Sequence, residues 1–199
     1  RLEELVAGAP DKRRQAEGAL WLARVQLAME QPADALATLE AHGGGVRAQA
    51  LAASFALTRA EARFALGQTA EAAAELDGFR EKYAEQDAAP AALRLLARIF
   101  MARRDWAGAQ DAVTLLETRH PEQPAAPAAG MDLAAALAAA GRNDAADAVL
   151  AGIETNYAGQ VWSERAALKA VELQLAQGRR PETMDRLREM AANKSLRPE

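Results

Sequence analysis

A period of 37 residues runs through this chain without an insertion or a deletion. Its clearest marker is a small or polar residue that we expect to end a helix. The marker recurs at Glu30, Gly67, Arg104, Gly141 and Gly178, and the differences 67−30, 104−67, 141−104 and 178−141 all equal 37. A period of this length is typical of a solenoid built from stacked supersecondary units. Since solenoids mostly act by presenting a surface, this period also bears on function.

Composition narrows the fold to helices. Half of the 199 residues are hydrophobic but only 5% are aromatic, and alanine is the dominant apolar residue. Alanine is the best helix former and allows close helix packing, so we predict an all-α protein. The absence of cysteine excludes disulfides and thiolate chemistry. The mixed charges, with a net charge of −4, do not favour nucleic acid. No apolar stretch approaches the ~20 residues of a membrane span, so we expect no direct membrane insertion.

Each period reads as two helices joined by a short turn. In the second repeat, Ala56, Ala60 and Phe64 follow helical spacing and lie on one apolar face. Gly67 is then expected to end the helix, and Thr69 to cap the start of the next. The fourth repeat follows the same logic, with Asn143 as the expected N-cap. Pro32, Pro124 and Pro127 suit turns or first helical turns.

These columns resemble the tetratricopeptide repeat (TPR) family. The small residue that this family has at the eighth position of each unit corresponds to Ala23, Ala60, Ala97, Ala134 and Val171. Its turn motif matches Gly67–Ala72 and Gly141–Ala146, and its end-of-unit proline matches Pro121. The resemblance implies a right-handed α-solenoid, a superhelix of antiparallel helix pairs. The period departs from the usual unit of about 34 residues, which implies longer helices or connections.

The repeat register predicts the domain organisation. We expect a single array over residues 1–199, in which residues 1–10 end a truncated unit and five 37-residue units cover about 11–195. Leu2, Leu5 and Pro10 keep the register of a preceding unit, so we expect a segment of a longer protein. The proline-rich tract 120–130 could be read as a domain linker, but the unbroken register argues against that interpretation.

The sequence offers no constellation of the kind that catalysis or ligand chemistry needs. His42 and His120 occupy different positions of their repeats and lack a partner for a site, so we interpret them as polar helix-end residues. Gly43, Gly44 and Gly45 lack the strand and the Lys-Ser/Thr of a phosphate loop. We therefore predict no enzyme, no catalytic or metal site and no cofactor.

The family resemblance implies a concave groove that is lined by the first helices and binds a peptide or helix of another protein. Carried over column by column, the groove residues are Trp21, Thr58, Leu95, Asp132 and Lys169, with Arg24, Glu61, Arg98, Ala135 and Glu172 as a second column. Trp21 is the predicted anchor, with packing beneath a preceding unit as the alternative. The alternation of Arg24, Glu61 and Arg98 is alternatively a ladder of salt bridges between repeats. The groove lacks the lysine–arginine clamp that grips acidic C-terminal peptides.

We therefore predict a protein-interaction scaffold, with self-assembly into homo-oligomers as the alternative. The tract 156–168 resembles a junction in bacterial cell-envelope repeat proteins, among them outer-membrane assembly lipoproteins, although the expected proline is absent. Residues 93–106 are similar to the repeat region of HemY-type membrane proteins. Arrays of this kind also precede outer-membrane barrels in exopolysaccharide-export proteins. These similarities imply a bacterial envelope or periplasmic location, with the cytoplasm as the alternative.

Overall fold

A computed structural model describes the chain except for residues 1–10, 44–48, 180–182, 185–186 and 189–199. The expected all-α class is confirmed, because every regular element of the described part is a helix. The chain divides into two compact bodies, which we call the N-terminal body, up to His120, and the C-terminal body, from Pro121. The division falls at the start of the proline-rich tract 120–130, and a single array over the whole chain stays a prediction.

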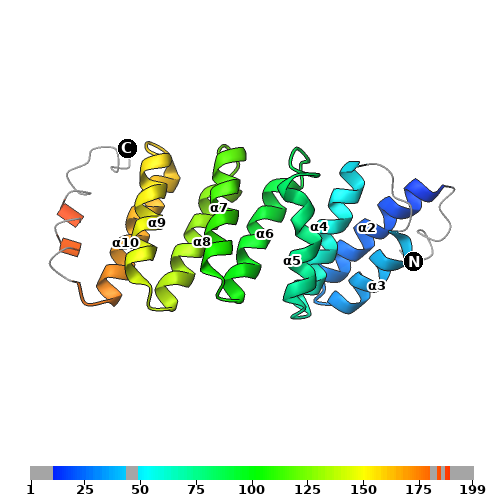
Figure 1. Ribbon diagram of the computed structural model, residues 1–199, viewed down its shortest axis with the longest axis horizontal. Coiled ribbons are helices and arrows are strands. Elements are labelled where there is room, and N and C mark those ends of the chain that lie inside the picture. The colour runs from blue at the N-terminus through cyan, green and yellow to red at the C-terminus, as the bar shows by residue number, and fades with distance from the viewer. Residues whose placement is uncertain (1–10, 44–48, 180–182, 185–186, 189–199) are drawn as a thin grey trace. The chain divides into compact units, whose positions relative to one another are not determined.

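Both bodies consist of helices packed in consecutive pairs (Figure 1). The N-terminal body contains α2 (Lys12–Ala28), α3 (Pro32–His42), α4 (Gln49–Ala65), α5 (Thr69–Asp77), the 3₁₀ helix η1 (Gly78–Arg80), α6 (Ala89–Ala102) and α7 (Trp106–Arg119). The C-terminal body contains α8 (Ala125–Ala139), α9 (Asn143–Asn156) and α10 (Val161–Ala176). We call α2, α4, α6, α8 and α10 the first helices of their repeats. In the N-terminal body α4 contacts both α2 and α6, so these three first helices form a row.

The 37-residue marker ends the first helix of every repeat in the same way. Glu30, Gly67, Arg104, Gly141 and Gly178 all have positive φ angles, between 57° and 77°. In each repeat the next amide donates to the carbonyl five residues earlier, as Gln68 N–H does to Arg63 O at 2.9 Å. This bond closes a Schellman motif, which satisfies a carbonyl that the helix leaves without a partner. The period is therefore visible directly in the backbone.

The repeated small and aliphatic columns form the core. The alanine five residues after the marker is fully buried in four repeats, and Thr183 takes its place in the fifth. Nine residues after the marker lie Leu39, Leu76, Val113 and Leu150, none of which is more than 1% exposed. Each of these side chains packs between the second helix of a repeat and the first helix. The same core contact therefore recurs every 37 residues.

Two of the predicted helix starts are wrong by one residue. Thr69 and Asn143 are the first helical residues of α5 and α9, and their N-caps are Gln68 and Arg142, which make no side-chain cap bond. The Schellman motif that ends the first helix fixes the backbone here, so the residue directly after the marker, Gln68 or Arg142, becomes the N-cap of the second helix. The predicted roles of the prolines are confirmed where they are described: Pro32 begins α3, Pro124 caps α8, and Pro127 lies in its first turn. Pro181, which we also expect in the first turn of a second helix, lies outside the described residues.

Candidate protein-interaction surface

The row of first helices in the N-terminal body presents alternating charges. Arg24 on α2, Glu61 on α4 and Arg98 on α6 occupy the same position of three successive repeats, and we call them the charged row. Both arginines are exposed and Glu61 is half-buried. Burial raises the pKa of Glu61, while attraction to Arg24 and then Arg98 lowers it by less. The carboxylate is therefore held between two cations at a place where water solvates it poorly.

Aromatic rings hold the two arginines of the charged row. The guanidinium of Arg24 lies 5.4 Å from the centroid of the Trp21 ring, within the same helix. That of Arg98 lies 5.7 Å from the Phe64 ring, which belongs to the preceding first helix. Each contact contributes about 0.5–1 kcal/mol at an exposed site. Both arginines are exposed, so they remain accessible to a partner.

The predicted salt-bridge ladder does not form as direct ion pairs. Within the described residues, Glu61 has neither a hydrogen bond nor an ion pair within 4.0 Å to Arg24 or Arg98. The three side chains interact through longer-range attraction and keep their hydrogen-bonding capacity for other groups. This arrangement suits a binding surface better than a structural bridge.

The structure corrects two of the predicted groove residues. Thr58 is 1% exposed and Leu95 is 7% exposed, so neither can contact a partner. Thr58 instead donates its hydroxyl hydrogen bond to Ser54 O at 2.9 Å. Their column lies at the edge where neighbouring first helices pack, which sequence columns alone could not distinguish from the groove. Trp21, in the same column of α2, is 66% exposed.

The remaining predicted residues lie in the C-terminal body. Asp132 is half-buried on α8. Lys169 and Glu172 lie on α10, where their Nζ and Oε2 atoms form an ion pair of 2.9 Å. Ala135 and Glu172 are exposed, and their place in a groove stays a prediction. The structure therefore brings together Trp21, the charged row and Phe64 in one body, and Lys169 with Glu172 in the other.

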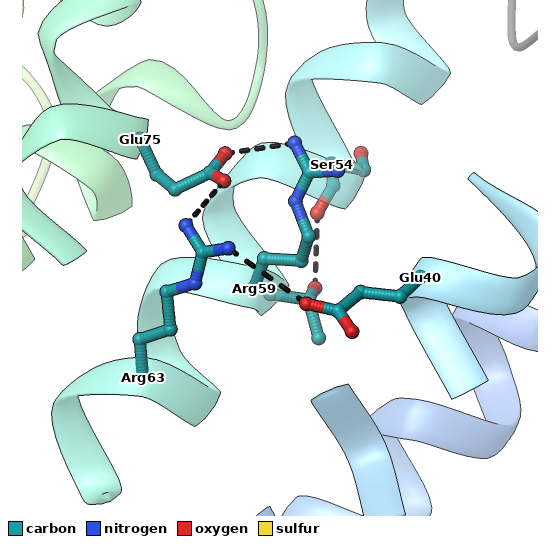
Figure 2. Close-up of polar contacts among 6 residues, drawn as sticks. Glu40, Ser54, Arg59, Arg63 and Glu75 are labelled. Atoms are coloured by element: carbon teal, nitrogen blue, oxygen red, sulfur yellow. Dashed lines mark hydrogen bonds and ion pairs between the residues drawn. The ribbon is translucent and has the colours of Figure 1, made fainter. Parts of the chain in front are cut away.

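A second polar cluster, which the repeat columns did not predict, lies on the other side of α4. Residues two apart on an α-helix point about 200° apart, so Arg59 and Arg63 face away from Glu61. Figure 2 shows both guanidiniums on the carboxylate of Glu75 from α5: Arg59 reaches Oε2 at 2.8 Å, and Arg63 reaches Oε1 at 2.6 Å. Arg63 also lies 3.8 Å from Glu40 of α3. We call Arg59, Arg63 and Glu75 the arginine–glutamate cluster.

The arginine–glutamate cluster lines an open groove of about 560 Å³. Phe55, Lys82 and Tyr83 also line this groove, and the ammonium of Lys82 lies 4.9 Å from the Tyr83 ring centroid. The side chains of the cluster are only 15–29% exposed, and each guanidinium is already neutralised. The cluster is therefore primarily a structural bridge between α4 and α5.

A signal in the sequence could have revealed this cluster. The three positions hold Leu133, Leu137 and Val149 in the fourth repeat, where 133−59, 137−63 and 149−75 all equal two periods. A position that is charged in one repeat and apolar in another indicates that the repeat with the charged residue packs differently from the others at that position. Comparing columns for polarity, as well as for identity, would have pointed to it.

The described residues hold no group of three or more His, Asp or Glu side chains that could bind a metal ion. His42 is the last residue of α3 and His120 follows the end of α7, as predicted for helix-end residues. No helix in the part of the chain that the structure covers is long and apolar enough to cross a membrane.

Comparison with known proteins identifies the fold. No protein-family model matches the chain, and no curated protein does. Among solved structures, it is similar to a candidate kinesin light chain of Podosopora anserina that consists of nearly identical TPR-like repeats. The identity is 20%, over 96% of this chain and 100% of that one, with a TM-score of 0.68. A single-substitution variant of that protein gives 21% identity, 88% and 92% coverage, and a TM-score of 0.66.

The chain thus has the TPR-like fold of an all-α solenoid, as its repeat columns predicted. Solenoids in general present extended surfaces that are used for binding. The handedness of the superhelix and the assignment to a bacterial type with 37-residue units stay predictions.

Proposed function

We propose that this chain is a non-catalytic scaffold that binds other proteins through the charged row. The observation that carries the proposal is the arrangement of Arg24, Glu61 and Arg98 on three adjacent first helices, without direct ion pairs among them. Groups of a partner can therefore pair with each of them. Because neighbouring helices pack about 8–10 Å apart, the row spans roughly 20 Å.

The spacing and charge of the row define the partner. An extended segment rises about 3.3 Å per residue, so about six residues span the row. Carboxylates near both ends of that segment would pair with the two arginines, and a donor in the middle would pair with Glu61. Such electrostatic complementarity sets specificity and association rate more than affinity.

A charge reversal tests this proposal. Affinity capture from an extract, followed by mass spectrometry, would compare the wild type with Arg98→Glu. The control is Arg103→Glu, which makes the same change at an exposed position just after α6. We expect Arg98→Glu to lose the specific partner and the control to retain it. Equal recovery by all three proteins would exclude the charged row as the binding surface.

We further propose that this scaffold acts in a bacterial envelope assembly or export system. Support comes from the resemblance of residues 156–168 to envelope repeat proteins and from the alanine-rich composition. A HemY-type repeat region is the second candidate, based on residues 93–106. Fractionation of cells that express this protein tests the location, and recovery in the cytoplasmic fraction would contradict an envelope role.

A further inference from the structure

Exposed apolar side chains gather on α2, the first helix of the first repeat, and on α10, the first helix of the fifth repeat. On α2, Trp21 is 66% exposed and Val25 is 41% exposed. On α10, Leu168 is 57% exposed and Leu175 is 49% exposed. Residues 168 and 175 are seven apart, about two helical turns, so they form one stripe along the helix. Water contact with large apolar groups of this kind is unfavourable and indicates an interaction surface.

The repeat positions of these exposed residues are buried or partly buried in the N-terminal body, at the place where α2 packs against α4. Leu20 of α2 belongs to one core cluster with Phe55 and Ala62 of α4, and Leu27 packs against that cluster. Leu20 is 6% exposed, and Ala62 is fully buried. Each first helix therefore has a trailing face, represented by Leu20 and Leu27, and a leading face, represented by Phe55 and Ala62.

The 37-residue register assigns the exposed residues to these two faces. Leu168 and Leu175 lie four periods after Leu20 and Leu27, since 168−20 and 175−27 both equal 148. The trailing face of α10 is therefore the apolar stripe. Val25 lies one period before Ala62, and Trp21 lies one period before the buried Thr58. Trp21 and Val25 therefore belong to the leading face of α2.

The charges at the two faces are complementary as well. Glu172 on α10 occupies the column of Arg24, Glu61 and Arg98, in which charges of opposite sign alternate along the N-terminal body. Glu172 already pairs with Lys169 at 2.9 Å, and an Arg24 placed on its other side would continue this alternation. Glu172 is exposed on the same helix as the apolar stripe, and Arg24 lies one turn from Trp21.

We propose that two copies of this chain associate head to tail, with the trailing face of α10 in one copy packed on the leading face of α2 in the other. The contact continues the packing already established between α2 and α4, with Leu175 facing Val25 as Leu27 faces the core cluster that contains Ala62. It joins two different surfaces, so it is heterologous and can add further copies. The apolar contact uses Leu168, Leu175, Trp21 and Val25, none of which belongs to the charged row, whereas Arg24 is shared by the two proposals.

Single cysteines test the orientation, because the chain has none of its own. A mixture of the Val25→Cys and Leu175→Cys proteins would be treated with a short bismaleimide cross-linker. In separate reactions, each protein would be treated alone. We expect the mixture to give several-fold more covalent dimer than either protein alone, since a head-to-tail contact brings position 25 to position 175. The matched control replaces Val25→Cys with Ala151→Cys, at an exposed position on α9, and should give background yield.

A charged substitution tests the apolar contact. Leu168→Glu, combined with Leu175→Cys, should lower the dimer yield several-fold while the circular dichroism spectrum stays helical. Equal yields from the mixture and from each protein alone would overturn the head-to-tail arrangement. A monomeric mass at all concentrations, with no dimer above the control, would overturn association and show that other parts of the chain cover these faces.

Discussion

Replacing Arg104 by glycine is expected to stabilise the chain, and replacing Gly67 by alanine is expected to destabilise it by a similar amount. Both residues end a first helix with a positive φ angle, 57° at Arg104 and 77° at Gly67. Residues that have a Cβ atom rarely adopt a positive φ angle, because their Cβ then approaches the following carbonyl oxygen. Arg104 and Glu30 therefore hold a strained backbone that glycine accepts freely in the same column.

The structure separates the backbone cost from any steric cost. A Cβ built on Gly67 has no other atom within 4 Å, so an alanine there would meet no neighbour. The left-handed conformation costs a non-glycine residue about 1–2 kcal/mol. Alanine recovers about 0.4–1 kcal/mol by restricting the unfolded chain, which leaves a net loss of about 1 kcal/mol. Arg104→Gly reverses both contributions and should gain about 1 kcal/mol.

Amide exchange gives the sharpest measurement, because helical arrays need not unfold in a single step. The reporters are the amides that close the two motifs, Gln68 to Arg63 O and Asp105 to Phe100 O, each 2.9 Å long. Gly67→Ala should speed exchange at the first, and Arg104→Gly should slow exchange at the second. Urea denaturation provides the global check.

Gly152 supplies a matched control for these substitutions. It lies inside α9, where alanine is favoured and the added Cβ would also meet nothing within 4 Å. Gly152→Ala should therefore stabilise by about 0.5–1 kcal/mol, in contrast to Gly67→Ala. If Gly67→Ala were as stabilising as the control, backbone strain could not explain why glycine occupies the marker column.

Three further predictions concern side chains. Glu75→Ala should lower stability by about 1–3 kcal/mol, since it leaves Arg59 and Arg63 without their counter-charge, whereas the triple change Arg59→Leu, Arg63→Leu and Glu75→Val should be near neutral; chemical denaturation distinguishes the two results. The raised pKa of Glu61 means that the folded chain binds this proton more tightly than the unfolded chain, so the wild type should lose stability as the pH rises above 4.5, and Glu61→Gln should lose less. The free energy of unfolding of both proteins, measured between pH 4 and about 7, would contradict this if its two pH profiles were parallel. Asp105→Ala should cost about 1 kcal/mol, because the Asp105 side chain accepts from Gly108 N–H at the start of α7; unchanged thermal stability would refute the role of this cap.

Local features of the fold could be read from the sequence because they depend on nearby residues. The marker column predicted where first helices end, and the backbone at Glu30 and Arg104 confirms it even without glycine. Column identity was a weaker guide to burial. Alanine recurs two residues before every marker, at Ala28, Ala65, Ala102, Ala139 and Ala176, yet all five are exposed. A recurring residue shows the same environment in each repeat, and that environment can be solvent.

The sequence by itself determined the period, the helix pairs and the small-residue core, since these follow from backbone hydrogen bonding and helical spacing. Tertiary structure alone decided which columns of the first helices are accessible to a partner. Thr58 and Leu95 are buried because a residue at the edge of a helix is covered by whatever packs beside it. Arg59 and Arg63 meet Glu75 across two helices, a contact that no spacing within one helix encodes. Exposure and pairing between helices depend on distances across the fold, and those exist only once the helices have packed.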